Sequence, residues 1–154
     1  FRKLTVIENI QSILENLPDY RGKKKKIIQR TEELIADLSL QKVAKSPGYA
    51  LSGGERRRVE IARALTCDPV FMLLDEPFAG IDPIVVGELQ HLVQGLQERG
   101  IGILITDHNV RETLGICDRA YILSSGTILE AGDPERIANS DIARKYYLGE
   151  GFSL

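Results

Sequence analysis

The chain has 154 residues, of which 43% are apolar, and a formal net charge of −2 at pH 7. A chain of this length forms about one domain or somewhat less, and no stretch approaches the roughly 20 consecutive apolar residues that span a membrane. The slightly acidic balance gives no electrostatic reason to expect nucleic acid or an anionic membrane surface as a partner.

Two amphipathic helices are predicted near the N-terminus. The first covers roughly residues 4–17, where Thr5 and Glu8 have the spacing of a capping box. The second covers roughly residues 23–38 and begins with four consecutive lysines, residues 23–26. Because positive charge is unfavourable at a helix N-terminus, we interpret this run as a solvated face, with lipid headgroups or a partner protein as the alternative.

Residues 51–55 (LSGGE) are the strongest local signal in the chain. Ser52 and Glu55 form a second capping box, which predicts that a helix begins here. Gly53 and Gly54 leave its first turn without side chains, so backbone N–H groups and the positive end of the helix dipole can approach an anion such as a phosphate. On this pattern alone, an ordinary capped helix and an anion site are equally supported.

Two apolar strands follow, and each ends in polar side chains. Residues 70–74 (VFMLL) are typical of a parallel strand buried on both faces, and Asp75 and Glu76 come directly after them. Residues 101–106 form the second strand, followed by an Asp-His pair at residues 107–108. Because ligands bind at the carboxyl ends of strands in open α/β sheets, we expect carboxylate and imidazole groups to meet at one rim. One carboxylate there can hold a magnesium ion and the other can orient or deprotonate a water molecule.

The remaining elements are predicted mainly from their caps and turns. Asp82, followed by a proline, caps the long helix between the two strands. Asn109 is expected to cap a short helix, and residues 121–129 have the pattern of a β-hairpin with a tight turn. Asp133 caps one more helix, and a last helix is expected to run through Tyr146.

Several side chains that suggest chemistry are interpreted as structural. Cys67 and Cys117 have no metal-ligand spacing and are expected to be buried, reduced thiols. His91 has no acidic or cysteine neighbour at ligand spacing and is expected on the surface. Long charged side chains on a helix usually face solvent, and we expect this of the four arginines on the helix that starts at the LSGGE stretch: Arg56, Arg57, Arg58 and Arg63.

Together these motifs resemble those of the ATP-binding-cassette (ABC) ATPases. Residues 51–55 are similar to the signature motif of that family, and residues 73–77 (LLDEP) to its Walker B motif with the catalytic glutamate. Residues 79–82 (AGID) are similar to its D-loop and residues 106–108 (TDH) to its H-loop. Four motifs in the order of the family make the resemblance specific.

The resemblance implies an α/β fold, an incomplete P-loop NTPase (ABC ATPase) domain. Residues 1–67 would form a helical subdomain that ends in the signature helix. Residues 68–154 would form the carboxy-terminal part of the parallel-sheet core, with helices and a C-terminal β-hairpin. The P-loop pattern Gly-x-x-x-x-Gly-Lys-Ser/Thr does not occur in the sequence, so we expect a carboxy-terminal fragment that begins just after the Q-loop. Without the P-loop part, apolar faces and edges of the sheet should be open, leaving the isolated fragment marginally stable or self-associating.

The resemblance also implies roles for individual residues. Asp75 would hold Mg²⁺, Glu76 would position and deprotonate the attacking water, and His108 would contact the γ-phosphate of ATP. Four residues would serve the nucleotide that a second copy of the ATPase holds in a head-to-tail dimer: Ser52, Gly53, Gly54 and Asp82.

Within the family, the sequence is most similar to that of the ATPase that powers bacterial lipopolysaccharide export. The similarity is seen in residues 51–65, 75–83, 105–114 and 147–150. ATPases of branched-chain amino-acid importers are its near neighbours. Such a protein is cytoplasmic, peripheral to the inner membrane, and acts through transmembrane transporter subunits. Two other classes stay open: a non-catalytic module that lends its signature motif to a complete ATPase, and a DNA-repair or chromosome-structure ATPase. The sequence has no long coiled coil or zinc module to favour the last.

Overall fold

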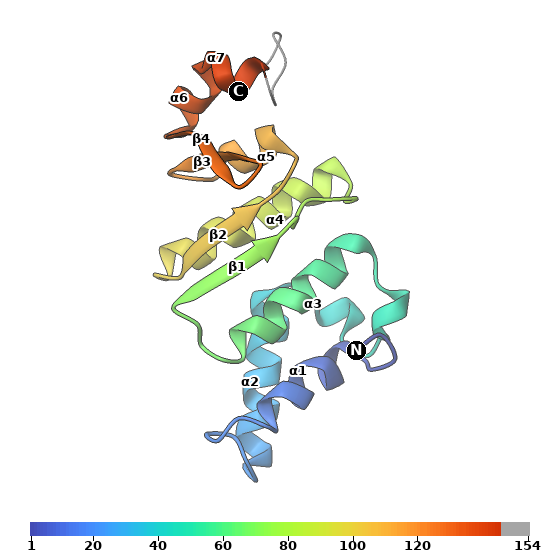
Figure 1. Ribbon diagram of the computed structural model, residues 1–154. Coiled ribbons are helices and arrows are strands. Elements are labelled where there is room, and N and C mark those ends of the chain that lie inside the picture. The colour runs from blue at the N-terminus through green and yellow to red at the C-terminus, as the bar shows by residue number, and fades with distance from the viewer. Residues whose placement is uncertain (146–154) are drawn as a thin grey trace.

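The computed structural model describes residues 1–145, which form an α/β arrangement of helices and two separate two-stranded sheets (Figure 1). In Figure 1, helices α1, α2 and α3 occupy the lower end and the parallel sheet lies in the middle with α4 along it. The hairpin and the short C-terminal helices occupy the upper end. The end of the last predicted helix, at Tyr146, lies outside the described residues.

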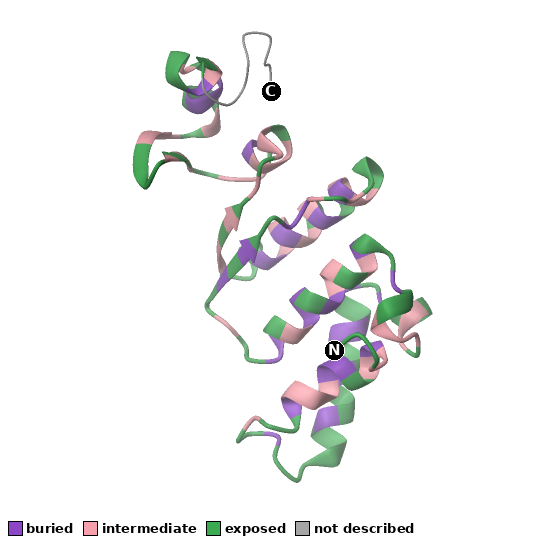
Figure 2. Cartoon of the chain, turned by 45° about the vertical axis from the view of Figure 1, so that its right-hand side comes forward, coloured by how far each residue is buried: buried purple, intermediate pink, exposed green. Residues whose placement is uncertain are grey.

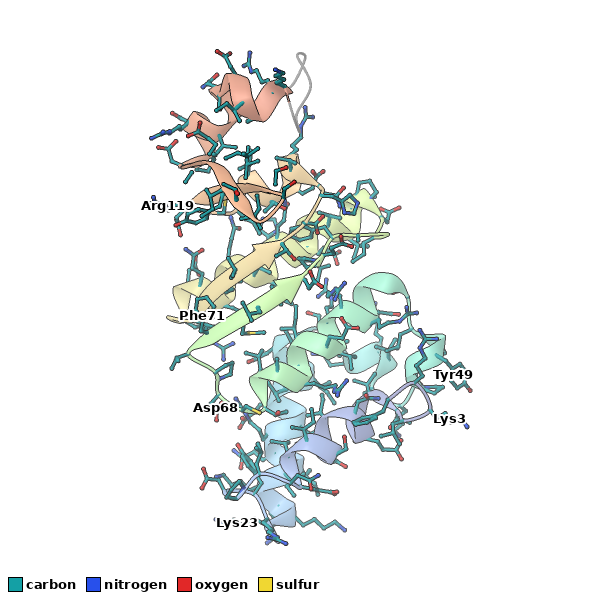
Figure 3. The ribbon with its side chains drawn as sticks, viewed as in Figure 1. Lys3, Lys23, Tyr49, Asp68, Phe71 and Arg119 are labelled. Atoms are coloured by element: carbon teal, nitrogen blue, oxygen red, sulfur yellow. The ribbon has the colours of Figure 1, made fainter. Side chains whose placement is uncertain are left out.

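The helices of the lower end begin where the sequence predicts. Thr5 Oγ1 accepts from the Glu8 N–H (3.2 Å) and the Glu8 carboxylate accepts from the Thr5 N–H (2.7 Å), so the first capping box is confirmed. The lysine run begins the second helix without a side-chain cap, and Figure 3 shows Lys23 at its lower end. The helical elements here are α1 (Val6–Leu14), α2 (Lys24–Asp37), α3 (Gly53–Leu65) and two short 3₁₀ turns, Gln41–Val43 and Gly48–Ala50.

The parallel sheet is a strand–helix–strand unit. Strand β1 (Phe71–Asp75) pairs in parallel with β2 (Gly102–Thr106), and helix α4 (Pro83–Glu98) connects them. The register places Asp75 opposite Thr106. The two strands therefore end side by side, which is the arrangement that the candidate site needs.

The hairpin and the short helices complete the described chain. The hairpin turn consists of Ser125 and Gly126, whose φ angles are 48° and 78°. Positive φ at both central residues is the geometry of a type I′ turn, so the predicted tight hairpin is confirmed. The elements are α5 (Val110–Leu114), β3 (Ala120–Ser124), β4 (Thr127–Gly132), α6 (Pro134–Asn139) and α7 (Asp141–Ala143).

The largest hydrophobic core joins the lower helices to the sheet. Ile10 of α1, Leu34 of α2 and Val59 of α3 belong to the same buried cluster as Met72 of β1 and Leu96 of α4. Figure 2 shows the buried residues gathered along these helices. This continuity fixes the signature helix α3 relative to the strand tips, while the division into two subdomains at residue 67 stays a prediction.

The parallel sheet is covered on one face only. Met72 and Leu74 are buried, but Phe71 is 56% exposed and Leu73 72% exposed, and Leu104, the neighbour of Leu73 on β2, is 47% exposed. The prediction that β1 is buried on both faces is therefore wrong for the described residues, because the core helices pack against one side. The expected open apolar face is present, and we call Phe71 (labelled in Figure 3), Leu73 and Leu104 the open face.

The structure contradicts two smaller predictions and confirms a third. Cys67 is exposed and Cys117 is half-buried, so the prediction that both thiols are buried is wrong for Cys67, which follows directly after α3. The Asn109 side chain makes no capping bond; the Asp107 carboxylate instead accepts from the Asn109 N–H (2.8 Å). His91 is exposed, as predicted.

None of the helices within residues 1–145 has the length and apolar character required to cross a membrane.

Candidate nucleotide site

The tips of the two parallel strands bring the predicted acid and imidazole groups together. His108 Nδ1 lies 3.6 Å from Glu76 Oε1, and the two side chains are 67% and 58% exposed. Beside them, the Thr106 hydroxyl donates to Asp75 Oδ1. Neighbouring residues of a strand point in opposite directions, and here Asp75 faces the hydroxyl while Glu76 faces the imidazole. The predicted meeting of these groups at one rim is thus observed, with both side chains accessible from solvent.

The backbone of Glu76 adopts an unusual conformation. Its φ is 44°, in the left-handed region that non-glycine residues seldom adopt. The Glu76 N–H donates to the Thr106 carbonyl (2.7 Å), and the Glu76 carbonyl accepts from Arg57 Nη2 of the signature helix (3.0 Å). Such a conformation persists where surrounding contacts over-determine it, and here the contacts come from β2 and α3.

The start of the signature helix has the predicted cap. The Ser52 hydroxyl accepts from the Glu55 N–H (3.3 Å), and the Glu55 carboxylate accepts from the Ser52 N–H (2.8 Å). Ser52 and Gly53 are exposed, so the first-turn N–H groups there can face a ligand. The prediction of an open first turn does not hold for Gly54, which is buried.

Gly54 is buried because helix α3 starts against the first turn of α4. A Cβ atom at Gly54 would lie 2.3 Å from Val85 Cγ1. Gly53 is less confined, since its nearest neighbour would be the Gly80 carbonyl of the predicted D-loop at 3.6 Å. Glycine at residue 54 is therefore required by helix contact, which the local sequence does not reveal.

Asp82 fulfils its predicted capping role. Its Oδ1 accepts from the Ile84 N–H (2.9 Å) at the start of α4, with Pro83 at the first helical position. The residue is exposed, and the second carboxylate oxygen makes no hydrogen bond within the described residues that would compete with a further ligand. A role across a dimer interface stays a prediction.

The signature-helix arginines are more constrained than predicted. Arg56 is exposed, but the Arg58 side chain is only 14% exposed and binds the Leu38 carbonyl (3.3 Å) and Glu88. Arg63 is half-buried, with its guanidinium group 4.8 Å from the centre of the Phe1 ring. The interpretation as solvent-facing side chains is therefore wrong for Arg58 and Arg63, whose partners lie far away in the sequence. Arg57 is half-buried and binds both Glu60, one turn along the same helix, and the distant Glu76 carbonyl.

The oxygens at the strand tips suit a magnesium ion shared with a phosphate ligand. Within residues 1–145, no group of three or more His, Cys, Asp or Glu side chains is placed to enclose a metal ion. Magnesium is usually bound by one or two carboxylates, with water and substrate phosphates completing its octahedron. Asp75 and the Thr106 hydroxyl next to it offer hard oxygen ligands of this kind.

Comparison with known proteins shows the family of the chain. The family profile described as "ABC transporter" matches residues 1–79. A probable ABC transporter ATP-binding protein of Azorhizobium caulinodans is 58% identical over the whole chain, which covers 54% of that relative. The lipopolysaccharide export system ATP-binding proteins LptB of Acidithiobacillus ferridurans and Escherichia coli K12 are 53% and 46% identical, and the chain covers 63% of each. The chain therefore spans between about half and two thirds of the length of these curated relatives.

Solved structures show the same fold. The ATP-binding cassette MJ1267 of an ABC transporter aligns with a TM-score of 0.84 and 26% identity, over 96% of this chain and 64% of that one. The protein cbiO1 of Clostridium perfringens, part of the ABC transporter complex cbiONQ, aligns with a TM-score of 0.80 and 28% identity, over 93% of this chain and 57% of that one. The family profile covers more than half of the residues and the solved structures share the observed fold, so the chain belongs to the ABC transporter family.

Proposed function

We propose that this chain carries the catalytic glutamate, the H-loop histidine and the signature motif of an ATPase that powers lipopolysaccharide export. The observation that carries the proposal is the pairing of Glu76 and His108, 3.6 Å apart at the tips of adjacent parallel strands. The identity to LptB proteins over the whole chain supports the transported substrate.

In this proposal each group at the strand tips has one task. The Glu76 carboxylate accepts a proton from the attacking water and orients it toward the γ-phosphate, as a general base does. The His108 imidazole donates a hydrogen bond to a γ-phosphate oxygen and reports its loss after hydrolysis. The Asp75 carboxylate, fixed by the Thr106 hydroxyl, holds magnesium. When bound, the ion neutralises charge on the phosphates, and the protein otherwise contributes mainly positioning and electrostatic stabilisation.

The signature helix serves a second nucleotide in this proposal. The exposed Ser52 and Gly53 at the N-terminus of α3 face the ATP held by another copy of the protein, where the helix dipole favours a phosphate. Gly54, which is buried against α4, acts by letting the start of α3 lie close to α4 rather than by facing the nucleotide. Asp82 contacts the partner across the interface. The dimer would act on transmembrane transporter subunits at the cytoplasmic side of the inner membrane, with residues 1–67 as the subdomain that receives them.

Hydrolysis is tested with two lengths of the protein. Residues 1–154 alone should release no phosphate from ATP above buffer, because the chain has no P-loop sequence. The protein extended upstream through a P-loop should hydrolyse ATP, and Glu76→Gln should lower kcat by at least about 10²-fold, since loss of a general base has effects of that size. Glu135→Gln, an exposed glutamate of α6 far from the strand tips, is the matched control and should leave kcat unchanged. Hydrolysis that survives Glu76→Gln would refute the proposed base.

The transported substrate needs a separate experiment. The extended protein is reconstituted with its transmembrane subunits in vesicles, and ATP-dependent extraction of lipopolysaccharide is compared with ATP-dependent uptake of leucine. We expect extraction and no uptake. Leucine uptake would instead assign the protein to branched-chain amino-acid import, while leaving the roles of Glu76 and His108 intact.

A further inference from the structure

Asp107 is the one residue at the strand tips to which the proposed chemistry gives no task, although its side chain is completely buried. Its two carboxylate oxygens have different partners. Oδ2 accepts from the Phe78 N–H (2.9 Å), in the segment that follows β1, and Oδ1 accepts from the Asn109 N–H (2.8 Å), directly after His108. Oδ1 also lies 3.8 Å from His108 Nδ1. One carboxylate therefore joins the loop that carries Glu76 to the loop that carries His108.

The segment around Glu76 is fixed at three points by groups from elsewhere in the chain. The Glu76 N–H is bound by the Thr106 carbonyl, its carbonyl by Arg57, and the Phe78 N–H by Asp107. The Phe78 ring is 1% exposed and anchors the far end of this segment in a small hydrophobic cluster with α4. Of the three polar contacts, only the one from Asp107 also reaches the residue that follows His108.

A carboxylate suits this place because both of its partners are N–H donors. An ionised aspartate offers two acceptor oxygens, whereas an asparagine offers one oxygen and an NH₂ group that would face one of the donors. Burial of a charge is expensive unless it is hydrogen-bonded, and bonds from N–H groups to a carboxylate are stronger than neutral ones. The buried charge is therefore satisfied only while both loops keep their observed positions.

We propose that Asp107 is a positioning residue that holds Glu76 and His108 at their mutual distance and so aligns the base with the γ-phosphate. This inference rests on the proposed ATPase function. In this proposal Asp107 itself touches neither substrate nor metal, and it acts through the Phe78 and Asn109 backbones and through the His108 ring, whose Nδ1 lies 3.8 Å from Asp107 Oδ1. A similar coupling would transmit any shift of the segment after Glu76 to the H-loop.

The test compares Asp107→Asn and Asp107→Ala in the protein extended through its P-loop, with Asp133→Asn as the matched control. Asp133 also accepts a backbone N–H (Arg136, 2.8 Å), but at the remote start of α6. Small misplacements of a catalytic group lower rates by up to about 10²-fold, so we expect Asp107→Ala to lower kcat by about 10²-fold and Asp107→Asn by less. KM for ATP should stay within about twofold, because a residue that aligns the base acts on the transition state rather than on the binding of ATP. Asp133→Asn should change neither constant.

Amide hydrogen exchange gives a readout that does not depend on activity. Exchange at both Phe78 and Asn109 should be faster in Asp107→Ala. It should be faster at one of the two amides in Asp107→Asn, which keeps a single acceptor oxygen, and unchanged at both in Asp133→Asn. Wild-type kcat in both Asp107 variants, or unchanged exchange at the two amides, would overturn the inference. If Asp107→Ala does not fold, Asp107→Asn alone decides, because it keeps the side-chain volume. If Glu76→Gln hydrolyses ATP normally, the proposed function fails instead, while the exchange result still decides whether Asp107 holds the two loops together.

Discussion

The contact between Gly54 and Val85 allows a stability prediction that can be checked by compensation. Gly54→Ala would place its Cβ 2.3 Å from Val85 Cγ1, well inside van der Waals contact, but 3.6 Å from Val85 Cβ. Valine in a helix has one strongly preferred χ1 rotamer, so Val85 cannot readily turn its methyl group away. Either the α3 start or the first turn of α4 has to shift.

The expected size of the effect follows from these distances. Adding a methyl group to a tightly packed contact costs about 1–3 kcal/mol. In a domain of 150–250 residues, 1 kcal/mol corresponds to about 2–4 °C in Tm, so Gly54→Ala should lower Tm by about 2–12 °C. In the double variant with Val85→Ala, the new methyl lies 3.6 Å from the remaining Cβ, an ordinary contact. The double variant should therefore be more stable than the sum of the two single variants predicts, by about 1–2 kcal/mol.

Thermal unfolding followed by circular dichroism, in the protein extended through its P-loop, measures this coupling. Gly87→Ala in the interior of α4 is the matched control, because no atom lies within 4 Å of a Cβ at that position. It should raise stability by about 0.5–1 kcal/mol, the usual gain of alanine over glycine within a helix. Additive effects of Gly54→Ala and Val85→Ala would refute the account of residue 54 as a contact-limited glycine.

Three further predictions follow from the described contacts. Arg58→Met keeps the apolar stem but loses the bonds to the Leu38 carbonyl and Glu88, so it should destabilise the protein to urea by about 1–3 kcal/mol; an unchanged urea midpoint would contradict it. Under limited iodoacetamide, mass spectrometry should find Cys67 alkylated before Cys117, because Cys67 is exposed whereas burial raises the pKa of the half-buried Cys117 thiol; equal rates would count against this. Residues 1–154 alone should self-associate through the open face. A monodisperse monomer in light scattering, together with a sharp thermal unfolding transition, would exclude this self-association.

The parts of this fold that were predictable from sequence are those with local causes. A capping box needs only residues three positions apart, and both predicted boxes are present. The meeting of Glu76 and His108 followed from two apolar runs that each end in polar residues, because parallel strands of one sheet end at the same edge.

The features that were not predicted depend on contacts between distant residues. Gly54 meets Val85, and Arg58 meets Leu38 and Glu88, through the way whole helices lie against one another. The role of Asp107 was missed for the same reason. A carboxylate placed between the end of a β-strand and a candidate site histidine could have indicated a positioning role from the sequence. The burial of β1 on both faces was predicted wrongly, because an apolar run predicts burial without showing which element provides it; the open face was expected only from the absence of a P-loop sequence.

At Glu76, whose backbone is left-handed, the residue that is best for stability differs from the residue that the proposed hydrolysis needs. For a side chain other than glycine, this conformation costs about 1–2 kcal/mol, more than the roughly 0.5–1 kcal/mol of chain entropy that a glycine there would add to the unfolded state. Glycine at residue 76 would thus give a sturdier protein with no base. Selection for thermal robustness alone would tend to erase this glutamate, so screens for stabilised variants of this chain need a turnover assay beside them.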